Sequence, residues 1–350
     1  MEAPPPIHGR GTSRNPANRF ERIEIAWDPD VDDPETPAPK TEFFWDDTKE
    51  IISWNTSPDI PFDAAINPYR GCEHGCVYCF ARPFHEYLGY SAGLDFETRI
   101  HVKRNAAELL RKQFMKKSWQ PQVVSISSVT DAYQPVEARL NVTRGLLEVF
   151  AEFRNPVGII TKNALVTRDI DLLGELAKHN AARVAVSITT LDESIARKLE
   201  PRTSTIRKRF EAVKMLTDAG IPTGVMLAPI IPGLTDSDIP GLVERAKRCG
   251  ATRVAMLPVR LPLGVGPLFE EWLGIHFPGH KQKVLNRIRE MRGGELNDGR
   301  FGSRMKGEGK RADHLHGLFR LAVSKHGMNE TRPAMNCEAF RRPGGTKAMF

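Results

Sequence analysis

Residues 67–80 read NPYRGCEHGCVYCF and place three cysteines, Cys72, Cys76 and Cys79, in a Cys-x3-Cys-x2-Cys spacing. Thiolates hold iron–sulfur clusters, and a short loop with three of them can bind three corners of a four-iron cubane while the fourth iron keeps no protein ligand. The amino and carboxylate groups of a small molecule can chelate such an open iron. The stretch therefore predicts a 4Fe–4S cluster on these three cysteines, with one coordination site left for a ligand.

A zinc site is the main alternative for the same cysteines, because a Cys3His set is a common structural zinc site. His74 or His85 would complete it, and the protein would then be a non-catalytic zinc-binding adaptor. Zinc loops usually contain two Cys-x2-Cys pairs, whereas this chain has one. The remaining cysteines, Cys249 and Cys337, are isolated and are expected to be free thiols. The spacing favours the iron–sulfur hypothesis.

Short apolar, β-branched runs alternate with amphipathic stretches from Phe62 onward, which is typical of βα units. Six such units in a row predict a parallel sheet covered by helices. Six units are too few to close an eight-stranded barrel, so we expect an α/β fold with a partial (β/α)6 TIM-like barrel and a site at the carboxyl ends of the strands. A flat doubly wound sheet is the alternative. The expected strands are 64–67, 123–128, 157–161, 183–189, 223–228 and 253–257, and the expected helices are 105–117, 136–153, 168–178, 204–219 and 237–249.

The flanks differ in composition from this core. Residues 1–45 are rich in proline and charge and predict a disordered or extended N-terminal arm. Residues 62–258 form the expected barrel. Residues 259–350 predict a basic C-terminal extension that covers the barrel, with a loosened pattern at 261–279 and helices at 281–292 and 315–324.

The formal net charge of +7 comes from residues 281–350, where Lys and Arg greatly outnumber Asp and Glu. Such a field attracts nucleic acid or another polyanion, although a solvated basic tail explains the charge equally well. No stretch is long and apolar enough to cross a bilayer, and residues 1–10 lack the apolar run of a signal peptide. We expect a cytoplasmic protein without a membrane partner.

The cysteine motif and the βα units together resemble the radical S-adenosylmethionine (SAM) superfamily over residues 62–258. The chain is similar to the branch that contains spore photoproduct lyase and the DNA repair photolyase-like proteins. This resemblance rests on the strand ends, which read Ser127-Ser128-Val129-Thr130-Asp131, Thr161-Lys162-Asn163 and Val186-Ser187-Ile188. It implies an enzyme whose cofactors are a 4Fe–4S cluster and SAM, and it leaves the lyase or transferase class undetermined.

The resemblance also implies which residues contact SAM. The hydroxyl residue after strand two, the lysine after strand three and the serine in strand four fall on Thr130, Lys162 and Ser187. Asp131 would accept from the amino group of SAM, and Tyr78 would place an aromatic edge beside the adenine. The turn at Glu200 and Arg202 would bring polar side chains to the ribose and carboxylate, although a helix-capping salt bridge explains these two charges almost as well.

One position departs from the lyase pattern. A cysteine two residues before the hydroxyl residue donates a hydrogen atom to the product radical in the lyase, and Ser128 stands at that place here. An O–H bond is a poor hydrogen donor to a carbon radical. The resemblance therefore supports SAM cleavage and does not support repair of spore photoproduct. Cys337 would reach the site only if the tail folds back, and a free tail thiol is the preferred interpretation.

The implied reaction needs a one-electron donor such as flavodoxin or ferredoxin. Reductive cleavage of SAM gives a 5′-deoxyadenosyl radical that abstracts hydrogen from a substrate, which the cofactor chemistry does not identify. Nucleic acid is one candidate, because Lys306, Lys310, Arg311 and Arg320 surround a Gly-rich stretch. A protein or a small molecule is the other.

Overall fold

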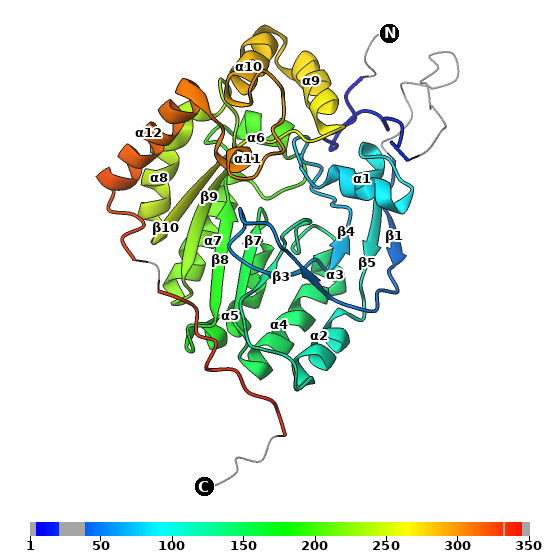
Figure 1. The fold of residues 1–350 in the computed structure, drawn as a ribbon, viewed down its shortest axis with the longest axis vertical. Helices are drawn as coiled ribbons and strands as arrows, with labels where there is room; N and C mark the ends of the chain where they lie inside the picture. Colours follow the sequence, from blue (N-terminus) through cyan, green and yellow to red (C-terminus); the bar gives the residue numbers. More distant parts are fainter. Residues whose placement is uncertain (1–4, 21–38, 332, 345–350) are drawn as a thin grey trace.

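The computed structural model describes residues 5–20, 39–331 and 333–344 of the 350 in the chain. The main sheet of these residues has seven strands in the spatial order β10-β9-β8-β7-β6-β3-β2 (Figure 1). The strands from β3 to β10 pair in parallel, and β2 pairs with β3 in the antiparallel direction. Their bounds are β2 (Ile52–Trp54), β3 (Ala64–Ile66), β6 (Val124–Ile126), β7 (Val157–Thr161), β8 (Ala182–Ser187), β9 (Thr223–Ile230) and β10 (Arg253–Pro258).

The strand order confirms the partial barrel. Parallel strands follow one another from β3 to β10 without a reversal of direction, whereas a doubly wound sheet reverses at its switch point. Since crossovers between parallel strands are right-handed, successive crossovers in one direction place their helices on the same face. The six parallel strands are the six that the sequence predicts, and in the described residues the sheet stays open between β10 and β2.

The predicted helices of the core are present, with one interruption. The expected helix 136–153 is divided into α3 and α4, because Asn141 has a left-handed backbone with φ 55°. Asparagine tolerates this conformation better than most residues, so the chain can turn there. The core helices are α2 (Ala106–Met115), α3 (Glu137–Leu140), α4 (Val142–Phe153), α5 (Ile170–Ala177), α7 (Ile206–Asp218) and α8 (Ile239–Arg248).

A second, small sheet lies beside the first βα unit and was not predicted. It has the order β1-β5-β4 among the described strands, and its strands are too short to show a period in the sequence. β1 lies at the end of the expected N-terminal arm, and β4 leads directly into the cysteine motif. The additional elements are β1 (Glu42–Trp45), β4 (Tyr69–Arg70), η1 (Arg82–Leu88), α1 (Leu94–Thr98), β5 (Arg99–Val102), η2 (Ala164–Asp169), α6 (Glu193–Leu199) and η3 (Asp236–Asp238).

The residues after β10 form α9 (Val265–His276), α10 (Pro278–Met291), α11 (Ser303–Lys306) and α12 (Gly309–Lys325). The expectation of a loosened pattern at 261–279 was wrong, because α9 occupies most of it. Pro267 obscures the helix in the sequence but is tolerated in a first turn, where its missing N–H has no intrahelical acceptor. Phe269 and Trp272 of α9 pack in one apolar cluster with Cys76 and Tyr78. The extension therefore builds one wall of the cysteine motif.

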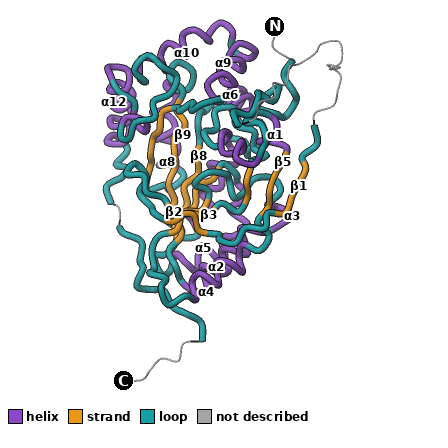
Figure 2. The backbone as a smooth tube through the Cα atoms, turned by 45° about the vertical axis from the view of Figure 1, so that its right-hand side comes forward, coloured by secondary structure: helices purple, strands orange, loops and turns teal. Residues whose placement is uncertain are grey.

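The C-terminal tail runs to the opposite end of the molecule from α9 and α10 (Figures 1 and 2). The N–H of Asn336 donates to the carbonyl of Asn180, which lies just before β8 begins, and Phe340 packs on Phe114 and Phe153. Cys337 is thus fixed near the amino ends of the strands, whereas parallel α/β folds bind substrates at the carboxyl ends. The interpretation of Cys337 as a thiol away from the site agrees with this position.

No helix in the described ranges is both long and apolar enough to cross a membrane. The division of the chain at residues 45, 62 and 258 stays a prediction.

Replacing Phe340 by alanine should lower the free energy of unfolding by about 2 kcal/mol, because the ring closes a partly buried contact with two core aromatic side chains. Equilibrium denaturation measures this change. Leu321→Ala is the matched control, since Leu321 is 68% exposed and should change stability little. Equal stability of the Phe340→Ala variant and the wild type would show that the tail does not pack on the barrel in solution.

Candidate functional site

The three cysteines lie on one loop, residues 71–80, which we call the cysteine loop. It follows β4 at the carboxyl end of β3, as the barrel predicts. Cys72 and Cys76 are buried and Cys79 is half-buried. Gly75 has a left-handed backbone with φ 67°, which permits the tight turn between the first two cysteines. Burial raises the pKa of all three thiols. Because thiolates are soft donors that suit iron–sulfur clusters, this loop fits the predicted cluster chemically.

A buried ion pair holds the cysteine loop from behind. Arg82 and Glu97 are fully buried, and their side chains approach to 2.6 Å. The Arg82 guanidinium also donates to the carbonyls of Gly75, Cys76, Ala92 and Gly93 at 3.0–3.3 Å. The sequence analysis missed both residues. The position of Arg82, three residues after the last cysteine, was the only available signal in the motif.

The described N-terminal segment 5–20 packs on the same ion pair. Glu97 accepts hydrogen bonds from the backbone N–H of Gly11 at 3.0 Å and from the hydroxyl of Thr12 at 3.1 Å. Gly11 touches the cysteine loop so closely that a Cβ on it would lie 1.7 Å from the carbonyl oxygen of Gly75. Position 11 therefore requires glycine. A segment that the sequence analysis treated as an arm is part of the support of the cysteine loop.

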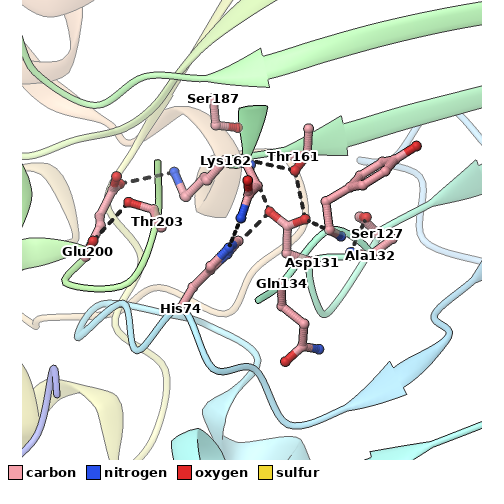
Figure 3. A network of polar contacts seen from close by, with 12 residues as sticks. His74, Ser127, Asp131, Ala132, Gln134, Thr161, Lys162, Ser187, Glu200 and Thr203 are labelled. Atoms are coloured by element: carbon pink, nitrogen blue, oxygen red, sulfur yellow. Dashed lines mark hydrogen bonds and ion pairs between the residues drawn. The ribbon is translucent and has the colours of Figure 1, made fainter. Parts of the chain in front are cut away.

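Asp131 is the centre of a polar network at the carboxyl ends of β6 and β7 (Figure 3). Its Oδ1 accepts from the Tyr133 N–H at 2.9 Å and the Thr161 hydroxyl at 2.7 Å. Its Oδ2 accepts from the Lys162 N–H at 2.7 Å and lies 3.4 Å from Nδ1 of His74. Burial alone would raise the pKa of Asp131, but His74 and the N–H donors outweigh it and lower the pKa. Protein groups thus use all four acceptor positions of this carboxylate.

His74 is not arranged as a metal ligand. Its Nδ1 faces Asp131, and its Nε2 lies 3.2 Å from the side-chain nitrogen of Asn163. Within the described ranges, no group of three or more His, Cys, Asp or Glu side chains is positioned to hold a single metal ion. The zinc alternative therefore has no support in this structure. A cubane cluster needs its thiolates spread around several irons, so the same observation does not count against it.

Lys162 extends from the end of β7 into the interior of the barrel. Its ammonium donates to the carbonyl of Ala228 at 2.8 Å, lies 3.1 Å from Glu200 and stands 5.6 Å from the centre of the Tyr78 ring. Its side chain is only 16% exposed, so Lys162 is not a solvated surface lysine. Glu200 is fully buried and also contacts Arg209 and the hydroxyls of Tyr78 and Thr189. Burial opposes its charge, but Arg209 and Lys162 prevail and lower the pKa of Glu200.

The remaining predicted residues differ in whether their polar groups already have protein partners. The Ser187 hydroxyl, at the end of β8, makes no hydrogen bond to any residue in the described ranges and lies beside the Asp131 network (Figure 3). Thr130 instead donates to the Tyr69 carbonyl at 2.7 Å. Arg202 pairs with Glu73 of the cysteine loop at 2.9 Å. Of these three residues, Ser187 is therefore the one whose side chain has no partner among the described residues.

Ser128 lies where the resemblance places a hydrogen-donating cysteine in the lyase. Its hydroxyl accepts a hydrogen bond from the Asn67 amide at 3.1 Å, and the Asn67 carbonyl oxygen accepts from the Val129 N–H at 2.8 Å. Asn67 thereby joins the start of the cysteine motif to the loop after β6. Ser128 takes part in this connection.

The radical SAM superfamily model matches residues 66–246. This match spans more than half of the chain, so the protein belongs to the radical SAM superfamily and is an enzyme. An uncharacterized protein of Mycobacterium tuberculosis is 36% identical over 234 residues, which are 66% of this chain and 68% of that protein. A radical SAM Nalpha-GlyT isomerase of Pseudomonas phage M6 is 29% identical over 233 residues, which are 65% of this chain and 46% of that protein.

Solved structures of spore photoproduct lyase share the fold. One has a TM-score of 0.58 at 16% identity and covers 81% of this chain and 79% of its own. Another, complexed with dinucleoside spore photoproduct, has a TM-score of 0.56 at 15% identity with the same coverage. These structural matches confirm the expected fold, and the family model confirms the suspected superfamily. Since the family uses a 4Fe–4S cluster and SAM, the cofactor prediction is also confirmed.

Replacing Gly11 by alanine should push the N-terminal segment off the cysteine loop, because the new methyl group would overlap the Gly75 carbonyl. After anaerobic reconstitution, we expect iron and sulfide content to fall several-fold relative to the wild type. Gly174→Ala in α5 is the control, since a Cβ there meets nothing within 4 Å. Wild-type iron retention in Gly11→Ala would contradict a supporting role for this contact.

Proposed function

We propose that Cys72, Cys76 and Cys79 hold the 4Fe–4S cluster and that SAM binds beside it, at the carboxyl ends of β6, β7 and β8. The observation that carries this proposal is that one buried loop presents three thiols next to an interior lysine and an unused hydroxyl at these strand ends. When bound, the reduced cluster supplies the electron that cleaves SAM to methionine and a 5′-deoxyadenosyl radical, which abstracts hydrogen from the substrate.

Three residues are assigned as direct SAM contacts. Lys162 uses two of its three N–H donors on Ala228 and Glu200, so one remains for a carboxylate or ribose oxygen. The Ser187 hydroxyl supplies a second polar contact. Tyr78 offers its ring, which Lys162 and Glu200 hold in place.

Four further residues position these contacts instead of binding SAM. Asp131 has no acceptor position left for an amino group, and the Thr130 hydroxyl proton is used by a backbone carbonyl. Glu200 orients Lys162 and Tyr78, and Arg202 braces the cysteine loop through Glu73. This revises the roles that the family resemblance implied, because each of these groups already has a protein partner.

The radical needs a dry and rigid surrounding so that it meets only its substrate. The Arg82–Glu97 pair provides rigidity by holding the carbonyls of Gly75 and Cys76. The apolar side chains of α9 exclude water from the same loop. We propose a flavodoxin or ferredoxin as the electron donor. A reducing compartment keeps clustered thiols available, so we propose a cytoplasmic location.

Nucleic acid is the substrate class that we propose. The excess of basic residues is concentrated after residue 281, and α11 and α12 carry exposed lysines at positions 306 and 310. The relative named as an isomerase comes from a phage, and one lyase structure holds a dinucleoside lesion. A protein or small-molecule substrate would not need this concentration of positive charge.

Anaerobically reconstituted wild type should be brown, should contain iron and sulfide in cluster proportion, and should form 5′-deoxyadenosine from SAM under dithionite. Cys76→Ala should lose at least a hundredfold of this activity, because two thiolates hold a cubane poorly. Cys249→Ala, which removes a thiol far from the motif in the sequence, should keep the wild-type rate. Colourless protein containing zinc, or a cubane that never cleaves SAM, would refute the proposal.

Removing the charges of Lys306 and Lys310 by substitution with glutamine should weaken binding to a labelled single-stranded oligonucleotide. The slope of log affinity against log salt should fall by about 0.7 for each lost phosphate contact. Fluorescence anisotropy across a salt series measures both changes. Lys112→Gln with Lys178→Gln removes the same charge from α2 and the end of α5 and is the control. If the wild type shows no salt-dependent binding, this result contradicts nucleic acid and favours a protein or small-molecule substrate.

A further inference from the structure

The open side of the partial barrel is bridged by polar contacts between its two edges. Asp59, in the connection from β2 to β3, accepts from the Gly302 N–H at 2.7 Å and pairs with Arg304 of α11 at 2.5 Å. Both side chains are largely buried, at 8% and 17% exposure. β2 and β10 are the outermost strands of the main sheet as described, so this contact joins the first part of the core to the C-terminal extension.

Three guanidinium groups gather next to this bridge. Arg304 is neutralised by Asp59. Arg292 is buried and donates to the carbonyls of Val259, Ser303 and Arg304 at 2.8–3.1 Å. The third is Arg260, two residues after the end of β10. These contacts give Arg304 an anionic partner and Arg292 several backbone acceptors, but they do not involve Arg260.

Arg260 has no anionic partner among the residues that the structure describes. Within the described ranges its side chain makes one hydrogen bond, from Nη1 to the sulfur of Met305 at 3.3 Å, and a thioether is a weak acceptor. Its Nε is shielded from solvent and has no acceptor in the part of the chain that the structure describes. Burial lowers the pKa of Arg260, Arg304 lowers it further, and Asp59 only partly offsets them. A buried, charged donor without a partner is costly, so this arrangement calls for an anion.

The position of Arg260 relates it to the reaction site. Its guanidinium carbon lies 5.9 Å from the centre of the Phe80 ring, and Phe80 directly follows Cys79. The Phe80 ring is 41% exposed. Arg260 follows the carboxyl end of the last strand of the barrel, which is the end where this fold binds its ligands. A guanidinium and an exposed aromatic ring therefore stand together at the edge of the cysteine loop.

We propose that Arg260 forms a subsite for an oxyanion of the substrate, a phosphate or carboxylate group that the guanidinium binds through two parallel N–H donors. This inference rests on the proposed function, because it places the substrate at the same strand ends as SAM. Phe80 packs against the adjacent part of the substrate. In this arrangement Lys162, at the end of β7, contacts SAM. Arg260, beyond β10, binds the substrate.

The test uses the full-length protein with inorganic phosphate and, separately, acetate as probes. Line broadening of the ³¹P signal, or of the acetate methyl signal in ¹H spectra, reports binding without any need for turnover. We expect saturable binding of at least one probe, weakened about tenfold or more in Arg260→Met, which keeps much of the side-chain bulk. Arg260→Lys should recover part of the affinity, because the charge returns without the bidentate geometry. Arg248→Met removes an exposed charge from α8 and should bind like the wild type.

The two probes distinguish the sources of the oxyanion. Phosphate binding that acetate does not displace supports a phosphate-bearing substrate, and a preference for acetate supports a carboxylate and contradicts nucleic acid. If the wild type and Arg260→Met bind each probe with the same affinity, the subsite is overturned. The affinity for SAM is measured in parallel, and a loss confined to SAM would assign Arg260 to the cofactor and also overturn it. Phosphate binding through Arg260 in a protein that holds no cluster would refute the proposed function while supporting the subsite.

Discussion

The buried ion pair of Arg82 and Glu97 is the contact on which the cysteine loop depends. A charge pair without solvent is stable only when further hydrogen bonds satisfy its atoms, and here four backbone carbonyls and two N-terminal donors do so. Those carbonyls belong to the loop that carries the three thiols and to the turn before α1. Loss of either charge would leave the other buried and unpaired, so the loop, the N-terminal segment and α1 are coupled through one pair.

Most polar groups of the site are hydrogen-bonded or ion-paired with other protein groups. Asp131, Thr130, Glu200 and Arg202 all have protein partners, so few groups remain to meet a ligand. Preorganised donors cost no rearrangement when the ligand arrives. The few unused groups, on Lys162, Ser187 and Arg260, are distributed around the carboxyl ends of β7, β8 and β10. Under the proposed function, SAM and the substrate would therefore bind on neighbouring parts of the barrel end.

The periodicity of the sequence predicted all six parallel strands, since apolar β-branched runs are a local signal. It did not predict β1, β4 or β5, which are short and are stabilised by pairing with residues far away in the chain. It also missed α9, where Pro267 in the first turn obscures the helical pattern. Spacing within the motif identified the thiols, but Arg82 and Gly11 act through contacts with Glu97, which lies 15 and 86 residues away from them, and no local pattern points to such contacts.

The sequence by itself determined the family, the partial barrel and the three thiols, because each is encoded in residues that are close together along the chain. Only the tertiary structure decided which predicted SAM residues still have a hydrogen-bonding position to offer, because that depends on partners from other strands. It also decided that the tail thiol Cys337 lies near the amino ends of the strands and that Arg260 has no anionic partner among the described residues. Folding alone brings such distant groups together or keeps them apart.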